Sequence, residues 1–174
     1  MPNETAIVLL VPEVGANIES IRMAHDPSAA LGVPAHMTLL YPWVPAPVQP
    51  ADLERLGAVV ARFAPYDLAF RALGTFERTL YLSPDDRGET ARLAHAIFEA
   101  FPDHPPYGGA VSAFVPHLTV ADGVSDLEAV RHEYEPTLAD VLPTKVAVRA
   151  VTVLESDANG MWHEAHTLPL EALR

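Results

Sequence analysis

The chain has 174 residues, 49% of them hydrophobic, which is enough for a sizeable core in one compact domain or in two small fused lobes. It carries 23 acidic and 11 basic residues, and the resulting net charge of −12 disfavours extended binding along a phosphate backbone. Cysteine is absent, so disulfides, cysteine-ligated zinc sites and thiol catalysis are excluded.

The first predicted element is a buried strand over residues 6–11. This apolar run of six residues is too short for a signal-peptide core or a membrane span, and no positively charged segment precedes it. We therefore expect a cytoplasmic protein that does not associate with a membrane.

Hydrophobic periodicity predicts the remaining elements of the first half. Apolar residues at helical spacing predict a helix over 14–25, and a strand follows at about 36–43. A second helix lies between the prolines at 50 and 65, and alternating segments predict strands over 67–73 and 79–83.

The second half repeats this order in pattern, although not in residue identity. Its predicted elements are a helix over 93–101, a strand over 115–121, a helix over 127–138, a long strand over 145–155 and, after a turn at 157–160, a last strand over 161–168. Helices interleaved with strands and a closing hairpin indicate an α+β fold, with antiparallel or mixed sheets and helices on the outer faces.

Two strings share the pattern His-x-Thr followed by an aliphatic residue, one at 36–39 and one at 117–120. Chance alone predicts roughly 0.5 occurrences of His-x-Thr from 8 His and 10 Thr, so one string carries no weight. The pair does, because each string follows a proline-containing entry and occupies the same place in its half. On a strand, His36 and Thr38 point to one face, as do His117 and Thr119. A pseudo-twofold arrangement of the halves would place both histidines in one cleft.

Two facing imidazoles suit general acid–base chemistry at a phosphodiester. One takes a proton from the incoming nucleophile and the other gives a proton to the leaving oxygen, since imidazole titrates near ~6.5. The threonine hydroxyls can donate hydrogen bonds to phosphate oxygens that carry negative charge. Neither string has metal-ligand spacing or a carboxylate cluster beside it, so we expect no metal.

The paired strings resemble those of the 2H phosphoesterase superfamily, in particular its 2′-5′ RNA ligase family and RNA 2′,3′-cyclic phosphodiesterase-like proteins. The likeness spans essentially the whole chain, because the segments 6–12, 34–42, 80–82 and 116–121 are also similar. The resemblance implies one bilobal domain over 1–174, with two lobes related by a pseudo-twofold axis.

The same resemblance implies an activity and the residues that perform it. The implied reaction is metal-independent hydrolysis of 2′,3′-cyclic phosphates to 2′-phosphates, without a cofactor. His36 and His117 are then the acid–base pair, with their individual roles open, and Thr38 and Thr119 hold the phosphate. Phe114 and Val115 precede the second string and Asp122 follows it, where some RNA-processing relatives carry basic residues. The expected partner is a nucleotide or a short RNA end carrying a cyclic phosphate, without an extended nucleic-acid groove.

Two other functions use the same cleft. One is formation of a 2′-5′ bond between RNA ends, for which a chain of charge −12 is poorly suited, and the other is non-catalytic binding of a phosphorylated ligand or nucleotide. At the level of single residues, each histidine or threonine could also be an ordinary strand residue.

Aromatic residues are the candidates for stacking on a nucleobase, with core packing as the alternative for each of them. We expect this role for Tyr41 and Tyr107, and Trp43 and Tyr81 are further candidates for it. The segment 107–109 is predicted to be a mobile substrate-covering loop. His163 and His166 lie three residues apart on a predicted strand and so face opposite sides, which indicates hairpin surface residues rather than metal ligands.

Overall fold

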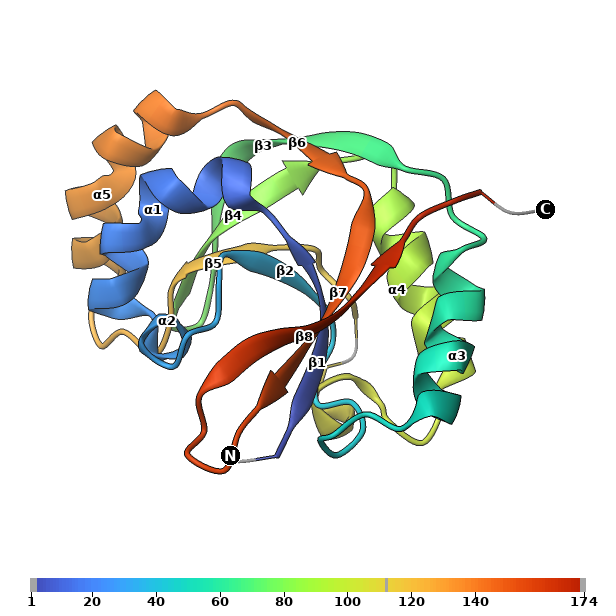
Figure 1. Ribbon diagram of the computed structural model, residues 1–174. Coiled ribbons are helices and arrows are strands. Elements are labelled where there is room, and N and C mark those ends of the chain that lie inside the picture. Colours follow the sequence, from blue (N-terminus) through green and yellow to red (C-terminus); the bar gives the residue numbers. More distant parts are fainter. Residues whose placement is uncertain (1–2, 112, 173–174) are drawn as a thin grey trace.

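The structure, a computed structural model, describes residues 3–111 and 113–172, which form one eight-stranded antiparallel sheet with helices packed against it (Figure 1). The strands are β1 Thr5–Leu10, β2 His36–Leu40, β3 Tyr66–Phe76, β4 Thr79–Asp85, β5 Leu118–Ala121, β6 Thr144–Val148, β7 Ala150–Ser156 and β8 Trp162–Pro169. The helices are α1 Pro12–His25, α2 Pro27–Ala30, α3 Pro50–Val60, α4 Glu89–Ala100 and α5 Leu127–Val141, with a 3₁₀ turn η1 at Pro106–Gly109. The α+β prediction is confirmed.

The two strands that carry the motifs lie side by side at the centre of the sheet. The strand order is β6-β3-β4-β5-β2-β1-β7-β8, so β5 and β2 are the fourth and fifth strands, and Met37 is paired with Leu118. Both of these residues are fully buried, as are Leu39 and Val120 to within 1%. Because side chains alternate along a strand, the His and Thr side chains project from the opposite face.

The second motif enters its strand later than the sequence pattern predicts. The strand was predicted over 115–121, but β5 begins at Leu118, so His117 lies just before the strand rather than on it. Pro116 accounts for the difference, because it has no N–H to donate to a strand ladder.

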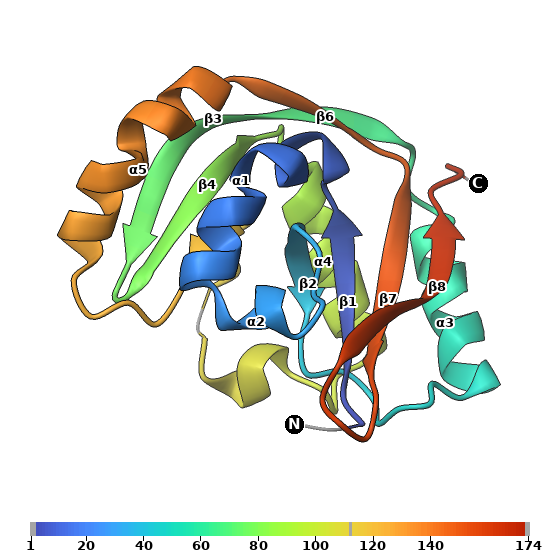
Figure 2. The ribbon, with the colours of Figure 1, turned by 60° about the vertical axis from the view of Figure 1, so that its left-hand side comes forward.

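The predicted long strand over 145–155 is two strands with different neighbours. The segment before Arg149 is β6, which pairs with β3 at one edge of the sheet, and the segment after it is β7, which pairs with β1 and β8. Arg149 donates hydrogen bonds to the carbonyl oxygens of Tyr66 and Val148 and pairs with Asp67. This stretch of chain therefore connects the edge strand β6 with β7, the strand next to the opposite edge of a strongly curled sheet (Figure 2).

The helices are exchanged between the two halves of the sheet. Helix α1 follows β1 but packs on β5 and β6 and against α5, whereas α4 precedes β5 but packs on β2 and against α3. Figures 1 and 2 show the pairs α1/α5 and α3/α4 on opposite sides of the motif strands. Each motif strand is therefore covered by a helix that follows, in the chain, a strand of the opposite half of the sheet.

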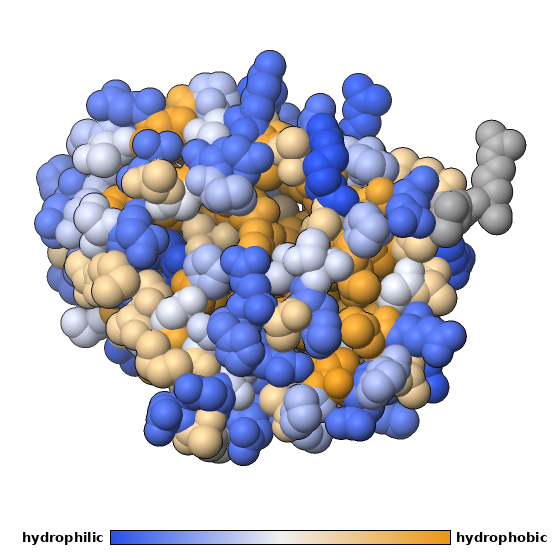
Figure 3. All heavy atoms as spheres, in the orientation of Figure 1, coloured by the Kyte–Doolittle hydropathy of each residue, from blue (hydrophilic) through white to orange (hydrophobic). Residues whose placement is uncertain are grey.

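The surface agrees with the composition. Hydrophilic residues cover much of the face shown in Figure 3, and hydrophobic residues show between them. Within residues 3–111 and 113–172, no helix has the length and apolar character needed to cross a bilayer.

A buried ion pair holds the chain segment that leads into the first motif. Arg22 on α1 and Asp26 at the start of α2 are 1% and 5% exposed. Arg22 donates from Nε and Nη2 to Asp26 Oδ2 over 3.1 and 2.9 Å, and Nη2 also donates to the Val33 carbonyl oxygen over 3.1 Å. Asp26 in turn accepts from the backbone N–H of Ser28. The pair thus ties α1, α2 and the residues before His36 together.

We predict that breaking this pair on one side destabilises the fold more than removing both partners. Asp26→Ala should lower the free energy of unfolding by about 3–5 kcal/mol, because it leaves a buried guanidinium without its counter-charge. Adding Arg22→Met should restore part of that loss. Urea unfolding of the two single variants and the double variant measures the coupling, and a double variant that loses the sum of the single losses contradicts it.

Candidate active site

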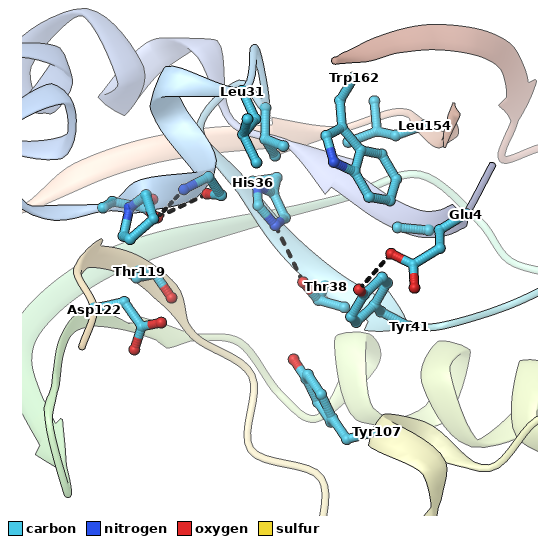
Figure 4. A pocket seen from close by; sticks show the side chains of 15 residues that line it. Glu4, Leu31, His36, Thr38, Tyr41, Tyr107, Thr119, Asp122, Leu154 and Trp162 are labelled. Atoms are coloured by element: carbon cyan, nitrogen blue, oxygen red, sulfur yellow. Dashed lines mark hydrogen bonds between the residues drawn. The ribbon is translucent and has the colours of Figure 1, made fainter. Parts of the chain in front are cut away.

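The first motif presents a histidine of defined tautomer. The Nδ1 atom of His36 lies 2.7 Å from the Pro34 carbonyl oxygen, which can only accept, so Nδ1 carries the proton. In the neutral ring Nε2 is then an acceptor, and it lies 3.1 Å from Thr38 Oγ1 (Figure 4). The Thr38 hydroxyl therefore donates to His36, and the histidine keeps a basic nitrogen on the cleft side.

The second motif repeats this geometry. The Nδ1 atom of His117 lies 2.7 Å from the Val115 carbonyl oxygen, again two residues before the histidine. Its Nε2 is therefore the basic atom of the neutral ring, as it is in His36. The two imidazoles are thus oriented by equivalent backbone contacts, which agrees with the predicted pseudo-twofold relation of the motifs.

Two aromatic rings pack against the imidazole of His117. The centroid of its ring lies 4.9 Å from that of Phe76 and 5.6 Å from that of Tyr81, and both contacts are T-shaped. Tyr81 in β4 crosses over Gly74 in β3, where an added Cβ would overlap the tyrosine ring. A side chain at position 74 would therefore displace Tyr81 and with it the packing around His117.

Burial shifts both histidines toward the neutral form. Desolvation lowers the pKa of His36 to about 4, with a smaller lowering contribution from the charge of Arg22 and an opposing one from Asp26. Desolvation also lowers the pKa of His117, and the nearby Asp122 opposes this shift. A positive charge on His117 further lowers the pKa of His36, so the two rings lie close enough to interact electrostatically. In the ligand-free protein both imidazoles are neutral at pH 7.

The motif residues line two adjoining cavities. The cavity on the His36 side has a volume of about 370 Å³, and the one on the His117 side about 700 Å³. Five residues line both cavities and so mark their junction: Thr38, Tyr41, Tyr107, Thr119 and Asp122. The structure therefore brings together all four His and Thr residues predicted from the two strings.

Positive charge is scarce in this cleft. Among the described residues that line the two cavities there is no lysine or arginine, whereas Glu4, Asp26, Glu77 and Asp122 are acidic. An anion entering the cleft is thus met by neutral hydrogen-bond donors and by the two imidazoles. A ligand with several phosphates would be repelled by the surrounding carboxylates.

Both tyrosines expected at the site are there. Tyr41 and Tyr107 form an edge contact at 6.2 Å between centroids, and the backbone N–H of Tyr107 donates to the Tyr41 carbonyl oxygen over 2.7 Å. The Tyr107 hydroxyl points toward Thr38 (Figure 4). The segment 107–109 lies against the junction of the cavities, and its predicted mobility stays a prediction.

The other two aromatic candidates have packing roles. Trp43 is 3% exposed and lies in the core, with its ring 5.2 Å from that of Phe101, so a stacking role for it is wrong. Tyr81 stacks on Phe76 at 4.5 Å and supports His117 rather than lining either cavity.

Sequence patterns missed several cleft residues that are distant from the motifs in the chain. They are Glu4 before β1, Leu31 after α2, Phe76 at the β3–β4 turn, His95 on α4 and Trp162 at the start of β8.

Two histidines lie close together on the last strand. His163 is exposed on β8, and His166 lies three residues further along the same strand. Over residues 3–111 and 113–172 no group of three or more His, Asp or Glu side chains is arranged to hold a metal ion.

Comparison with known families identifies this arrangement of paired motifs. The family model of the 2′-5′ RNA ligase superfamily matches residues 10–160, most of the chain. The chain belongs to the 2′-5′ RNA ligase superfamily. The resemblance to 2H phosphoesterases inferred from the two strings is therefore confirmed. A sequence search of curated proteins finds no match.

Solved structures of this superfamily share the fold over their whole length. The structure of E. coli LigT with 3′-AMP superposes with a TM-score of 0.62 at 16% identity, covering 98% of this chain and 99% of LigT. TT0787 of Thermus thermophilus gives 0.64 at 18% identity, with 97% and 98% covered. Kluyveromyces marxianus Usb1 with uridine monophosphate gives 0.52 at 14% identity, with 97% and 99% covered.

We predict that the first motif histidine of this superfamily member titrates far below an ordinary histidine. In NMR spectra of the ligand-free protein, His36 should titrate at about pH 4 and His117 below pH 6.5, because burial penalises both charged forms. An imidazole at position 36 that titrates near 6.5 would contradict the burial of this ring.

The same shift makes stability depend on pH. Since the folded pKa of His36 lies below the unfolded value of 6.5, its contribution to stability is complete above pH 6.5 and is lost as the pH falls toward 4. Between pH 6.5 and 4 the native protein should lose up to about 3 kcal/mol more of its free energy of unfolding than the variant His36→Asn, because asparagine does not titrate.

Proposed function

We propose that this protein hydrolyses 2′,3′-cyclic phosphodiesters to 2′-phosphates by two-histidine acid–base catalysis. The observation that carries the proposal is the pairing of β2 with β5, beside which Thr38 and Thr119 lie at the junction of two cavities, with His36 lining one cavity and His117 the other. Each histidine has its Nδ1 held by a backbone carbonyl and its Nε2 available as a base or, once protonated, as an acid.

The reaction needs one proton transfer on each side of phosphorus. One neutral imidazole takes a proton from water as the water oxygen bonds to phosphorus, and the P–O3′ bond breaks as the other, protonated imidazole gives its proton to O3′. The product is a 2′-phosphate, and the two histidines have exchanged protonation states. Either histidine can serve as the base in this scheme.

The threonines supply hydrogen bonds to the phosphate. Thr38 and Thr119 lie at the junction of the cavities, and their hydroxyls can donate to non-bridging oxygens as negative charge builds up. For Thr38 this requires release of its hydrogen bond to His36, which occurs when Nε2 becomes protonated and can no longer accept. Proton uptake by His36 thus frees the Thr38 hydroxyl for the phosphate.

The size and charge of the cleft favour a small substrate. A nucleotide, or the end of a short RNA, offers a single phosphodiester to the neutral donors, whereas a longer backbone would meet the carboxylates of Glu4, Glu77 and Asp122. No lysine or arginine is among the described lining residues, and the fourth carboxylate, Asp26, is paired with the buried Arg22. The structures of LigT with 3′-AMP and of Usb1 with uridine monophosphate agree with a nucleotide ligand. Ligation must hold two RNA ends at once, and this cleft does not favour it.

We predict that both histidines are required for turnover. His36→Ala and His117→Ala should each lower kcat for 2′,3′-cyclic nucleotides on the order of 10²–10⁴-fold, in buffer containing EDTA. Thr38→Val and Thr119→Val, which keep the shape and remove the hydroxyl, should lower kcat roughly 10²-fold. Phosphorus NMR should identify the product as the 2′-phosphate.

The exposed His132 on α5 provides the matched control, since His132→Ala removes an imidazole distant from the cleft and should leave kcat unchanged. Saturable nucleotide binding with no turnover in the native protein would instead favour a binding function.

We also predict a bell-shaped pH profile with an acidic optimum for kcat/KM. This parameter reports the free protein, in which both histidines have lowered pKa values, so the optimum should lie between pH 4 and 6.5. Bound phosphate favours the charged imidazoles, so the profile of kcat should lie at higher pH than that of kcat/KM. A kcat/KM that rises steadily to pH 8 would rule out the two-imidazole scheme.

A further inference from the structure

The cavity on the His36 side has an aromatic and apolar wall whose residues do not line the cavity on the His117 side. Trp162, Leu31, Val33 and Leu154 form this wall, and Trp162 meets Tyr41 in an edge contact at 6.1 Å between ring centroids. Figure 4 shows the indole of Trp162 and the carboxylate of Glu4 at the same end of the cavity. A flat ring placed along the indole would therefore lie beside a carboxylate.

Trp162 is held in place by its backbone. Its N–H donates to the Leu31 carbonyl oxygen over 2.8 Å, which ties the β7–β8 hairpin to the loop after α2. Gly32 in that loop has a φ of +87°, and a Cβ there would stand 2.9 Å from the Trp162 carbonyl oxygen. Only a glycine allows this close approach, so the wall is built by two segments distant in the chain.

Glu4 is held by hydrogen bonds to both its backbone and its side chain. Its backbone N–H donates to Ser156 Oγ over 2.8 Å, and the Ser156 N–H donates to the Glu4 carbonyl oxygen over 2.9 Å. The Tyr41 hydroxyl donates to Glu4 Oε2 over 2.8 Å. Burial and the neighbouring carboxylate raise the pKa of Tyr41 to about 12, so the phenol stays protonated and Glu4 stays an acceptor.

From this geometry we propose that the Trp162 end of the cavity binds the nucleobase and that Glu4 is a specificity-determining residue favouring bases with an exocyclic amino group. Adenine, cytosine and guanine each offer such a donor to a carboxylate, which can only accept. Uracil has no exocyclic amino group: it presents a carbonyl oxygen there, which repels a carboxylate, and its one ring donor is N3–H. This inference rests on the proposed function, because it names the substrate class for the same site.

The kinetic test compares the four 2′,3′-cyclic nucleotides. In the native protein, kcat/KM for the cytidine substrate should exceed that for uridine at least about 10-fold, since cytosine presents an amino donor where uracil presents a carbonyl oxygen, and N3 accepts in cytosine and donates in uracil. Glu4→Gln should reduce this ratio to about twofold or less. Glu99→Gln, an exposed carboxylate on α4, is the control for loss of charge and should keep the native ratio.

A binding test works without turnover. The chain has two tryptophans, so Trp43→Phe leaves Trp162 as the single fluorescent reporter in the cavity. Quenching by 3′-CMP should occur at about 10-fold lower concentration than quenching by 3′-UMP, and Glu4→Gln should remove the difference. Calorimetry on the chain with both tryptophans gives the same comparison if the Trp43 variant folds poorly.

The outcomes separate this inference from the proposed function. Hydrolysis of all four nucleotides at equal rates, or a native ratio in the Glu4 variant, overturns the role of Glu4 and leaves the hydrolase standing. Selective binding of 3′-CMP without hydrolysis of any cyclic nucleotide supports the role of Glu4 and overturns the hydrolase. Equal binding of 3′-CMP and 3′-UMP overturns the base preference whatever the activity.

Discussion

The antiparallel contact between β2 and β5 is the constraint on which the site depends. It is short, with one registered pair at Met37 and Leu118, yet it joins the two four-stranded halves of the sheet. Alternation along both strands then sends Met37 and Leu118 into the core and the motif hydroxyls to the other face. Core packing and site geometry are therefore set by the same few residues, and a register shift of one residue would exchange the two faces.

Much of this arrangement was predictable from local sequence. The paired strings predicted that the four His and Thr residues lie together at the candidate site, because an alternating strand has only two faces and both strings place His and Thr on the same one. Helix and strand order followed from periodicity and proline positions. Glu4 and Trp162 were not predictable in the same way, because they reach the cavity from opposite ends of the chain through pairing of β1 with β7 and of β7 with β8. Such pairing leaves no short-range pattern.

The two motifs are equivalent in backbone geometry but not in charge. Five residues after each histidine the chain places Tyr41 in one case and Asp122 in the other, and both residues line the junction of the cavities. Beneath His36, the charge of Arg22 is compensated by Asp26, so the cleft gains no net positive charge from it. Under the proposed function, a phosphate would be held by hydroxyl and backbone dipoles and by the two imidazoles, whose charged forms it would favour, and this limits how many phosphates the cleft would accept.

The exchange of helices and the return of β7 to β1 have a consequence for how the site forms. The pairing partners Thr5 and Glu155 stand near opposite ends of the chain, and α1 reaches its final neighbours only after β5 and β6 exist. Contacts of such high sequence separation carry a large loop-closure cost and form late in folding. Synthesis of nearly the whole chain must therefore precede assembly of the cleft, and neither half of the sequence contains a smaller working version of it.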